Sequence, residues 1–274
     1  MKFFKIIRKF ILLIIVFGIL YLTYTTYFIS PTAYTITNET YTHQKITSSL
    51  NGLKIAYISD LNLNEKSGLK TLEKAINDLN KRPFDMVIFG GDLYDGKIFQ
   101  SKDVSASLKK IVCKYGKFAI LGDKDEDAKA ETIQTLQNGG FEVLDNEART
   151  LYYKDTSLTL IAANNKSQIA DFDTNSKTIQ LCVAHEPDTF ANHKGKINLQ
   201  LSGHSYGGSI YIPYFGPLIS QEGAKVYNHG TYEEKGSTLI VSNGFSGPES
   251  FPYKLFSKNQ ILIVTLKTQT IEKS

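Results

Sequence analysis

The stretch LKIAYISD, residues 53–60, decides the fold class, because it is a short β-rich run that ends on a polar residue. Two runs of the same kind follow, DMVIFGGD at 85–92 and KFAILGD at 117–123. Helical patterns lie at residues 69–81, 104–115 and 128–138. Strands that alternate with helices form a sheet with parallel strands and crossover helices. The sequence therefore predicts an α/β fold.

The second half of the chain is richer in predicted strands. They are LTLIAA at 158–163, TIQLCVA at 178–184, INLQLSG at 197–203, GSIYIP at 208–213, STLIVSN at 237–243 and QILIVTL at 260–266. The sequence contains no internal repeat and no low-complexity segment. A single domain with two sheets is the simplest arrangement of these elements, and we place it at residues 53–270.

The N-terminal segment predicts a membrane anchor. Residues 10–29 form a mostly apolar run that is long enough to cross a bilayer as a helix, and residues 1–9 form a basic flank. Because positive residues stay on the cytoplasmic side, we expect a single-pass protein of the cell membrane with a cytoplasmic N-terminus and its globular domain outside. A cleaved signal peptide is the alternative, although no clear small-residue cleavage site directly follows the apolar run. Residues 30–52 are polar and rich in threonine, as expected of a tether and an entry loop.

Composition limits the class of function. The chain of 274 residues is 42% hydrophobic and 21% charged, as in an ordinary globular protein, and its net charge is +4. No long basic run occurs beyond the N-terminal flank, so the sequence does not indicate a nucleic-acid partner. Cys113 and Cys182 each lie in an apolar run, and we expect them to be core thiols rather than a disulfide or a metal-binding pair.

Carboxylate and imidazole groups follow five of the predicted strands, at the strand ends where open α/β sheets build their sites. They are Asp60 with Asn62, Asp92 with Asp95, Asp123 with Lys124 and Asp125, His185, and His204. A single Asp after a strand is commonly a helix cap or a turn former, but five such strand ends indicate a shared site. Because Asp and His are the usual ligands of Zn²⁺, Mn²⁺ and iron, we expect a metal centre there.

The motif GHSYG at residues 203–207 offers a competing interpretation, because it matches the G-x-S-x-G nucleophile elbow of serine hydrolases. An elbow requires a helix after the serine, whereas Ser205 is followed by the β-rich run at 208–213. His229 is the only later histidine, and Glu222 is the only acidic residue between it and Ser205. A serine hydrolase that uses Ser205 is the alternative that this motif offers, although the residues around it do not fit an elbow.

The motifs SDLN, GGDLYD, LGDKD, AHEPD and GHSYGG occur in an order that resembles the calcineurin-like metallophosphoesterase family, over residues 45–267. The family pattern is D-x-H, G-D, G-N-H-[DE], H and G-H-x-H. The runs GGSIYIPYFGPL and GTYEEKGSTLIVSNGFSGP are similar to those of its membrane-associated bacterial branch. The resemblance implies a four-layer αββα sandwich of two mixed sheets, in which a metal-activated water hydrolyses a phosphate ester.

The resemblance also implies two metal sites. The first corresponds to Asp60, Asn62, Asp92 and Tyr206, and the second to Asp92, Asp123, His185 and His204. In the first site Asn62 and Tyr206 stand where the family has histidines, and a neutral phenol is a poor metal ligand near neutral pH. In the second site Asp123 replaces an asparagine and keeps a ligand oxygen. We expect one divalent ion, Mn, Zn or Fe, at the second site and a weak or absent one at the first.

Lys124 stands where the family has its catalytic histidine, and Lys124 and Asp92 are the predicted catalytic residues. A lysine supplies positive charge but shuttles protons poorly at pH 7, because its ordinary pKa is about 10.4. We expect the Lys124 ammonium group either to lie among Asp60, Asp92 and Asp123, in place of a cation, or to point to solvent.

Two functions remain open on these motifs. One is a membrane-anchored phosphoesterase that acts on a phosphorylated small molecule or a lipid-linked phosphate. The other is a pseudo-phosphoesterase that keeps the fold and binds a phosphorylated ligand or a protein partner. The altered D-x-H, G-N-H and G-H-x-H motifs favour the second function, whereas the four ligand types kept at the second site favour the first.

Overall fold

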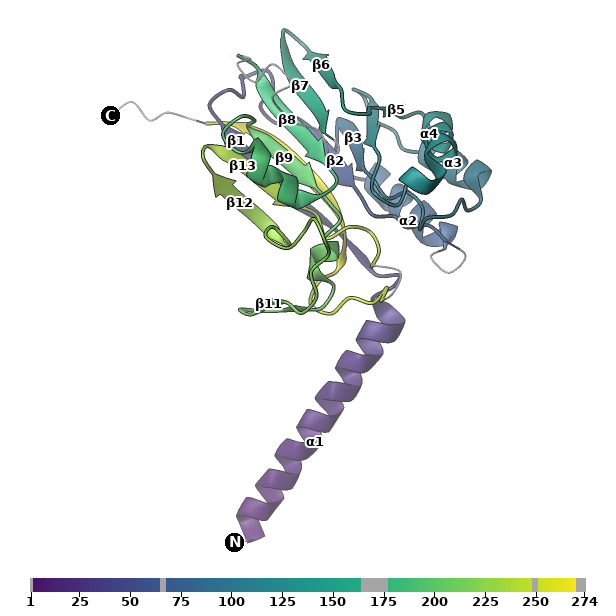
Figure 1. Cartoon of the computed structure of the whole chain (residues 1–274). Helices are drawn as coiled ribbons and strands as arrows, with labels where there is room; N and C mark the ends of the chain where they lie inside the picture. Colours follow the sequence, from purple (N-terminus) through teal and green to yellow (C-terminus); the bar gives the residue numbers. More distant parts are fainter. Residues whose placement is uncertain (1, 65–67, 164–176, 248–250, 270–274) are drawn as a thin grey trace, which may run out of the picture.

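The computed structural model describes residues 2–64, 68–163, 177–247 and 251–269. A long helix, α1 (Lys2–Tyr24), continues into a π-helical turn (Thr25–Ile29) and leads into a domain with two six-stranded sheets, as Figure 1 shows. The predicted end of the domain, residue 270, lies outside the described residues.

The first sheet has the strand order β1-β14-β2-β3-β4-β5. Its strands are β1 (Tyr34–His43), β2 (Lys54–Ile58), β3 (Met86–Gly90), β4 (Lys117–Ile120), β5 (Glu142–Val143) and β14 (Asn259–Thr268). Strands β2 to β5 run parallel, β14 is antiparallel to β2, and β1 is parallel to β14. The parallel order agrees with the strand–helix alternation of the sequence.

Three helices connect the strands of the first sheet: α2 (Leu69–Asn80), α3 (Ser101–Lys109) and α4 (Lys129–Asn138). Helices α2 and α4 match their predicted bounds to within one residue. Helix α3 begins three residues earlier and ends six residues earlier than the predicted 104–115. The chain leaves the helix there because the backbone N–H groups of Lys114 and Tyr115 both donate to the Asp85 carbonyl, at 3.0 and 2.8 Å.

The second sheet has the strand order β12-β13-β9-β8-β7-β6. Its strands are β6 (Ala148–Tyr153), β7 (Thr156–Ala163), β8 (Ile179–Ala184), β9 (Leu199–Ser202), β12 (Gly230–Glu234) and β13 (Ser237–Val241). The central strands are parallel, and an antiparallel hairpin closes each edge. The sheet is therefore mixed, as predicted.

The predicted strand at 208–213 is wrong except for two residues. Tyr206–Gly208 form a 3₁₀ turn, and Gly207, Gly208 and Ser209 have positive φ, which is incompatible with an extended strand. Only Tyr211–Ile212 are extended, as β10, and they pair with β11 (Gly216–Pro217) in a small hairpin outside both large sheets.

Side-chain alternation along the strands produces the layers. In β2, Ile55 and Tyr57 face the second sheet, whereas Ala56 and Ile58 face helices α2 to α4. On the outer face of the second sheet, the short helix α5 (Phe190–His193) packs on β13 through Phe190. This arrangement confirms the αββα sandwich of two mixed sheets. The two cysteines are free, as predicted, with Cys182 buried and Cys113 partly exposed.

The prediction that residues 30–52 form a tether is wrong for 34–43. This segment is strand β1, and all ten of its residues pair in parallel with β14. Tyr41 is 5% exposed, and its hydroxyl donates to the Asn198 carbonyl of the second sheet at 3.0 Å. This strand was missed because its residues are mostly polar, which is normal for an edge strand with one face in contact with water. The Thr and Tyr residues were a usable signal, since both favour strands.

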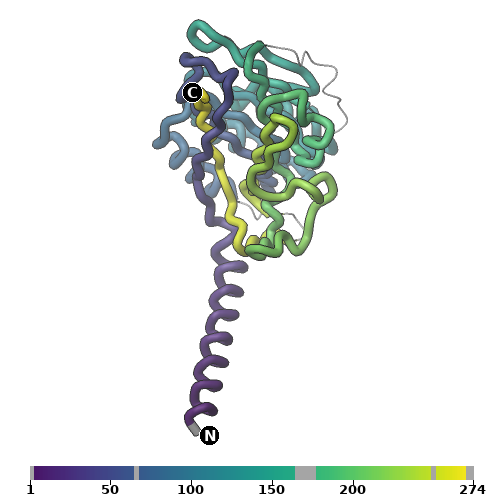
Figure 2. The backbone as a smooth tube through the Cα atoms, turned by 90° about the vertical axis from the view of Figure 1, so that its left-hand side faces the viewer, coloured from purple at the N-terminus to yellow at the C-terminus, as the bar shows by residue number. Residues whose placement is uncertain are grey.

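Helix α1 projects away from the domain (Figures 1 and 2). Residues Phe3–Ile29 are long and apolar enough to cross a membrane, and none of their most apolar window is buried in the protein. The helix begins at Lys2, so the predicted boundary between the basic flank 1–9 and the span 10–29 does not interrupt it.

The placement of β1 predicts that Tyr41→Ala will destabilise the domain by about 3–5 kcal/mol, the usual cost of deleting a buried aromatic ring. A free tether would give no effect. The measurement is denaturant unfolding of the detergent-solubilised full chain. Thr42→Ala, at the exposed neighbouring position, is the matched control and should change the free energy of unfolding by less than about 0.5 kcal/mol.

Candidate metal centre

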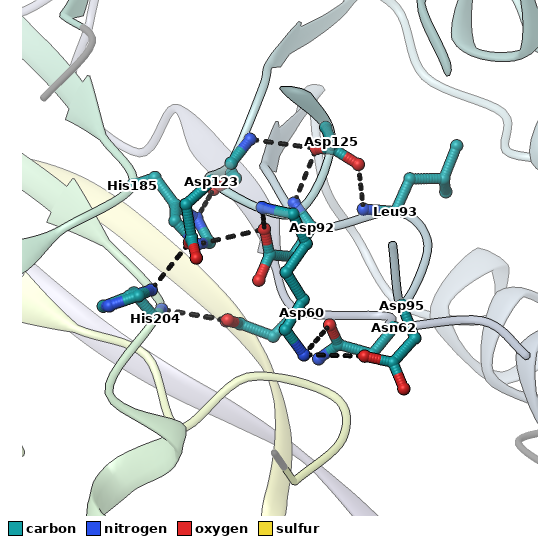
Figure 3. Close-up of polar contacts among 12 residues, drawn as sticks. Asp60, Asn62, Asp92, Leu93, Asp95, Asp123, Asp125, His185 and His204 are labelled. Atoms are coloured by element: carbon teal, nitrogen blue, oxygen red, sulfur yellow. Dashed lines mark hydrogen bonds and ion pairs between the residues drawn. The ribbon is translucent and has the colours of Figure 1, made fainter. Parts of the chain in front are cut away.

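The carboxyl ends of strands from both sheets meet at one edge of the sandwich, where most of the predicted site residues lie (Figure 3). Asp92 follows β3, Asp123 follows β4, His185 follows β8 and His204 follows β9. The first two strands belong to the first sheet and the last two to the second. Packing of the sheets therefore brings together residues that are far apart in sequence.

Four of these side chains form a tight cluster. His185 Nε2 lies 3.1 Å from Asp123 Oδ1 and 3.4 Å from Asp92 Oδ1, and His204 Nδ1 lies 3.0 Å from Asp123 Oδ1. One ligand atom from each residue lies within 4.8 Å of the others. Two carboxylates and two imidazoles at this separation are a suitable ligand set for a divalent cation.

The hydrogen bonding of the cluster also fits a cation. Asp92 Oδ2, His185 Nε2 and His204 Nδ1 are buried and form no well-aligned hydrogen bond among the described residues, although Asp123 Oδ1 lies within 3.1 Å of both nitrogens. A buried polar atom left in this state costs about 1–3 kcal/mol. Coordination of a divalent ion would satisfy all three atoms at once, so the residues present fit the metal that the sequence predicts.

Outer contacts orient both imidazoles. His185 Nδ1 lies 2.7 Å from the Gly90 carbonyl, and His204 Nε2 lies 2.5 Å from the Glu222 carbonyl. Because a carbonyl only accepts hydrogen bonds, these two nitrogens are the donors. In a neutral ring the other nitrogen then carries the free lone pair, and in both residues that nitrogen faces the cluster.

The histidines and aspartates of the cluster stabilise each other's ionised forms. Burial alone would lower the pKa of both imidazoles, but the facing carboxylates, Asp92 and Asp123 at His185 and Asp123 at His204, raise both values above the ordinary range. Burial opposes ionisation of Asp123, yet the two histidines hold its pKa well below the ordinary value. The site thus attracts positive charge, either as protons or as a metal ion.

Asp125 fixes the loops that carry the cluster and is not one of the four ligands. Its carboxylate accepts hydrogen bonds from the backbone N–H groups of Asp92 at 2.8 Å, Gly122 at 2.9 Å and Leu93 at 3.0 Å. Burial, with repulsion from Asp92, raises the pKa of Asp125 to about 7. Its position after a strand was visible in the sequence, but which backbone groups it would bind was not.

The backbone at the site is left-handed at many positions. Those with positive φ are Asp60, Asn62, Asp92, His204 and Tyr206. Residues other than glycine take this conformation at a cost, and such strain is concentrated at functional sites. Glycines allow the close approach of the loops: a Cβ on Gly203 would lie 2.5 Å from Asp60 Oδ2, and one on Gly91 would lie 2.7 Å from His185 Nδ1.

The other residues of the predicted first metal site lie beside the cluster. The Asp60 carboxylate is fully buried and accepts a hydrogen bond from the His204 backbone N–H, at 3.0 and 3.2 Å from its two oxygens. Burial raises its pKa. Asn62 donates to Ser246 Oγ at 2.6 Å, and Tyr206 is buried with its ring 5.6 Å from the Lys124 ammonium.

The Lys124 side chain points into the site, so the expectation that it points to solvent is wrong. Its ammonium group donates to Asn62 Oδ1 at 3.0 Å and pairs with Asp95 Oδ1 at 2.8 Å, and its side chain is 22% exposed. The expected partners, Asp60, Asp92 and Asp123, were also wrong, because the loop after Asp92 brings Asp95 closer. Asp95 was visible as a carboxylate after a strand, but nothing in the sequence paired it with Lys124.

Ser205 does not lie on a nucleophile elbow. Its hydroxyl accepts a hydrogen bond from the Gly207 N–H at 3.1 Å and caps the 3₁₀ turn Tyr206–Gly208, which leads to β10 and not to a helix. The His229 ring stacks on Tyr211, with the ring centroids 4.3 Å apart. These contacts give Ser205 a structural role in the turn that follows His204.

The chain is similar in sequence to known proteins. The family model of calcineurin-like phosphoesterases matches residues 53–208. The uncharacterized metallophosphoesterase YkuE of Bacillus subtilis is 31% identical over 244 residues, which cover 83% of this chain and 85% of that protein. A zebrafish (Danio rerio) transmembrane protein with metallophosphoesterase domain is 24% identical over 82% of this chain, which spans about half of that protein's length, 55%.

Among solved structures, GAP50, the anchor in the inner membrane complex of Plasmodium, superposes with a TM-score of 0.47 and 10% identity. The match covers 78% of this chain and 80% of that one. The matched segment of the family model contains the whole four-residue cluster, from Asp92 to His204. The chain therefore belongs to the calcineurin-like phosphoesterase family.

Proposed function

We propose that this protein is a membrane-anchored, metal-dependent phosphoesterase with one metal ion at Asp92, Asp123, His185 and His204. The main support is the convergence of these four side chains, in which Asp92 Oδ2, His185 Nε2 and His204 Nδ1 are buried without a well-aligned hydrogen bond. When bound, Mn²⁺, Zn²⁺ or Fe²⁺ would supply Lewis-acid activation of water and neutralise charge on a phosphoryl group.

The protein's own residues would orient the ligands and add charge. The Gly90 and Glu222 carbonyls hold the two imidazoles with a free nitrogen toward the cluster. The Lys124 ammonium, partly exposed beside the cluster, would attract the oxygens of a phosphate ester. Its backbone N–H donates to Asp92 Oδ1 at 3.2 Å, so the loop that carries this charge is tied to a metal ligand.

At the predicted first metal site we propose that the Lys124 ammonium replaces the second ion. Asn62 and Asp95 bind it, and the Tyr206 ring faces it. The replacement of three family histidines, by Asn62, Tyr206 and Lys124, also supports the alternative function. That function is a pseudo-phosphoesterase that binds a phosphorylated ligand without turnover. Measurements of metal content and turnover separate the two functions.

The anchor proposal rests on α1, which is apolar and unburied along most of its length and carries its basic residues, Lys2, Lys5, Arg8 and Lys9, at its N-terminal end. It places the domain outside the cytoplasm and gives it phosphorylated small molecules or lipid-linked phosphates of the cell envelope as substrates. No feature of the charge distribution supports a nucleic-acid partner.

The metal proposal predicts that the wild-type chain holds about one ion and that His204→Ala lowers its metal affinity by at least about 10–100-fold, the loss seen even for outer-shell partners. Hydrolysis of a chromogenic phosphodiester with Mn²⁺, Zn²⁺ or Fe²⁺ should fall with it. Ser205→Ala, at the adjacent buried position, is the matched control and should keep both metal and activity. Metal content is measured by mass spectrometry after dialysis.

Three outcomes would contradict this proposal in different ways. A bound ion without turnover on any ester would favour the pseudo-phosphoesterase. No bound ion at millimolar metal would remove the metal site altogether. Loss of activity in Ser205→Ala with its metal intact would restore the serine hydrolase.

The ammonium proposal predicts that Asn62→His with Tyr206→His will not admit a second ion efficiently while Lys124 is present, because the ammonium lies 3.0 Å from Asn62 Oδ1. Adding Lys124→His should raise bound metal from about one towards about two ions per chain, since imidazole is a good ligand for these metals. Turnover should rise as well, because an imidazole donates a proton near neutral pH. Two tightly bound ions in the wild-type chain would overturn this proposal.

The anchor proposal predicts that protease added to intact cells removes the domain from Leu53 onward, while the α1 segment stays with the membrane. The readout is immunoblotting with tags at each end of the chain. A domain that is fully protected would place it in the cytoplasm. A soluble mature chain that lacks residues 1–29 would show a cleaved signal peptide instead.

A further inference from the structure

The β10–β11 hairpin exposes large apolar side chains that have no partner within the described residues. At its tip Tyr214 is fully exposed and Phe215 is 89% exposed, and Leu218 and Ile219, just beyond β11, are 61% and 60% exposed. Residues 209–221 contain no charged residue and no histidine. Several large apolar side chains exposed close together in an uncharged segment indicate an interaction site.

The hairpin lies at the end of the domain from which α1 emerges. In Figure 1, β11 lies at the level of the top of α1, on the other side of the lower end of the domain, and in Figure 2 the green part of the chain likewise extends down to the level at which the purple helix begins. The two views agree, so the hairpin and the end of the apolar helix lie at similar heights along the molecule. A bilayer that surrounds α1 would therefore meet the hairpin.

The C-terminal end of the apolar helix packs directly on the domain and is not separated from it by a flexible linker. The Tyr27 and Tyr253 rings pack with centroids 4.5 Å apart. Ser30 Oγ accepts a hydrogen bond from the Lys254 N–H at 2.9 Å, and the Ser30 carbonyl accepts one from Asn259 Nδ2 at 3.0 Å. Residues on both sides of Leu255 thus hold the point where α1 enters the domain.

The same short segment holds the base of the hairpin. The Leu255 N–H donates to the Ser209 carbonyl at 2.9 Å, and the Tyr211 N–H donates to the Leu255 carbonyl at 3.0 Å. Consecutive residues, 253–255, therefore connect the last turn of the anchor to the start of β10. This connection fixes the position of the hairpin relative to the end of the apolar helix.

We propose that the hairpin, residues 211–219, is a second membrane contact whose tip lies in the interfacial layer of the bilayer that α1 spans. Tyrosine and phenylalanine are suited to this layer, and a segment without charges pays no cost for desolvating them. The end of the apolar helix is aromatic as well, because Tyr24 stacks on Phe28 there. The proposal rests on the membrane anchor of the proposed function.

This contact would hold the candidate metal centre at the lipid surface. The hairpin begins seven residues after His204, and the chain returns to the site at Glu222, whose carbonyl accepts a hydrogen bond from His204 Nε2. One segment therefore leaves the metal cluster, reaches the membrane face and comes back to a metal ligand. The favoured substrate class is then a phosphate ester held at headgroup level in the membrane.

The absence of tryptophan from the sequence allows a direct test. Phe215→Trp introduces a single tryptophan at the tip, which is excited selectively over the 16 tyrosines, and the full chain is reconstituted in phosphatidylcholine vesicles with brominated acyl chains. Its emission should shift to shorter wavelength and lose most of its intensity relative to unbrominated vesicles. Tyr152→Trp is the control, since Tyr152 is 82% exposed on β6, at the far end of the domain in Figure 1, and its emission should not change.

Flotation of the vesicles separates failure of the anchor from failure of the hairpin contact. A chain that does not float with the vesicles would overturn both the anchor and the contact. A chain that floats while Phe215→Trp is quenched no more than Tyr152→Trp would overturn the contact alone. A blue shift without quenching by brominated lipid would place the tip against a protein surface, including a second copy of this chain, and would also overturn it.

Discussion

The structure of the site depends on the repulsion between carboxylates that the ends of β2, β3 and β4 bring together. Asp60, Asp92 and Asp125 are buried, and Asp123 faces both histidines. Like charges at such distances are costly unless positive charge lies between them or some of the groups take up protons. Burial accordingly raises the pKa values of Asp60 and Asp125, whereas the imidazoles keep Asp123 ionised. Every other feature of the site can be understood as a source of that positive charge.

The two halves of the site obtain their positive charge differently. The half with His185 and His204 keeps free ligand atoms and suits a metal ion. In the half near Asn62 the positive charge is the Lys124 ammonium group, which forms an ion pair with Asp95. Lys254 lies behind Asp60, fully buried, with its ammonium on the Asn243 and Gly244 carbonyls. Burial lowers its pKa to about 7, although the charge of Asp60 acts in the opposite direction.

The sequence predicted the parts of this structure that follow from local patterns. Strand–helix alternation predicted the α/β fold, the family resemblance implied the two mixed sheets, and polar residues after strands predicted the cluster around His185. The strand predicted at 208–213 failed for a local reason, the positive φ of Gly207, Gly208 and Ser209, but two other errors arose where a contact distant in sequence decides the outcome. The strand at 34–43 depends on pairing with β14 at the other end of the chain. The partner of Lys124 depends on how two loops pack, because Asp95 lies on a different loop. Neither contact leaves a signal in local periodicity or composition.

The strand at 34–43 also changes what the anchor does. A tether of about twenty free residues would let the domain sample heights on the order of 25 Å above a bilayer, by the square-root scaling of flexible chains. In this structure Ser30 is bound to the domain and the next residues enter the sheet at Tyr34, so that freedom is lost. If α1 spans a membrane as proposed, a fixed domain would reach phosphoryl groups at one height only, and without the entropy cost of confining a mobile tether. Under that proposal, the rigid connection would favour substrates carried by the membrane over those that diffuse freely in solution.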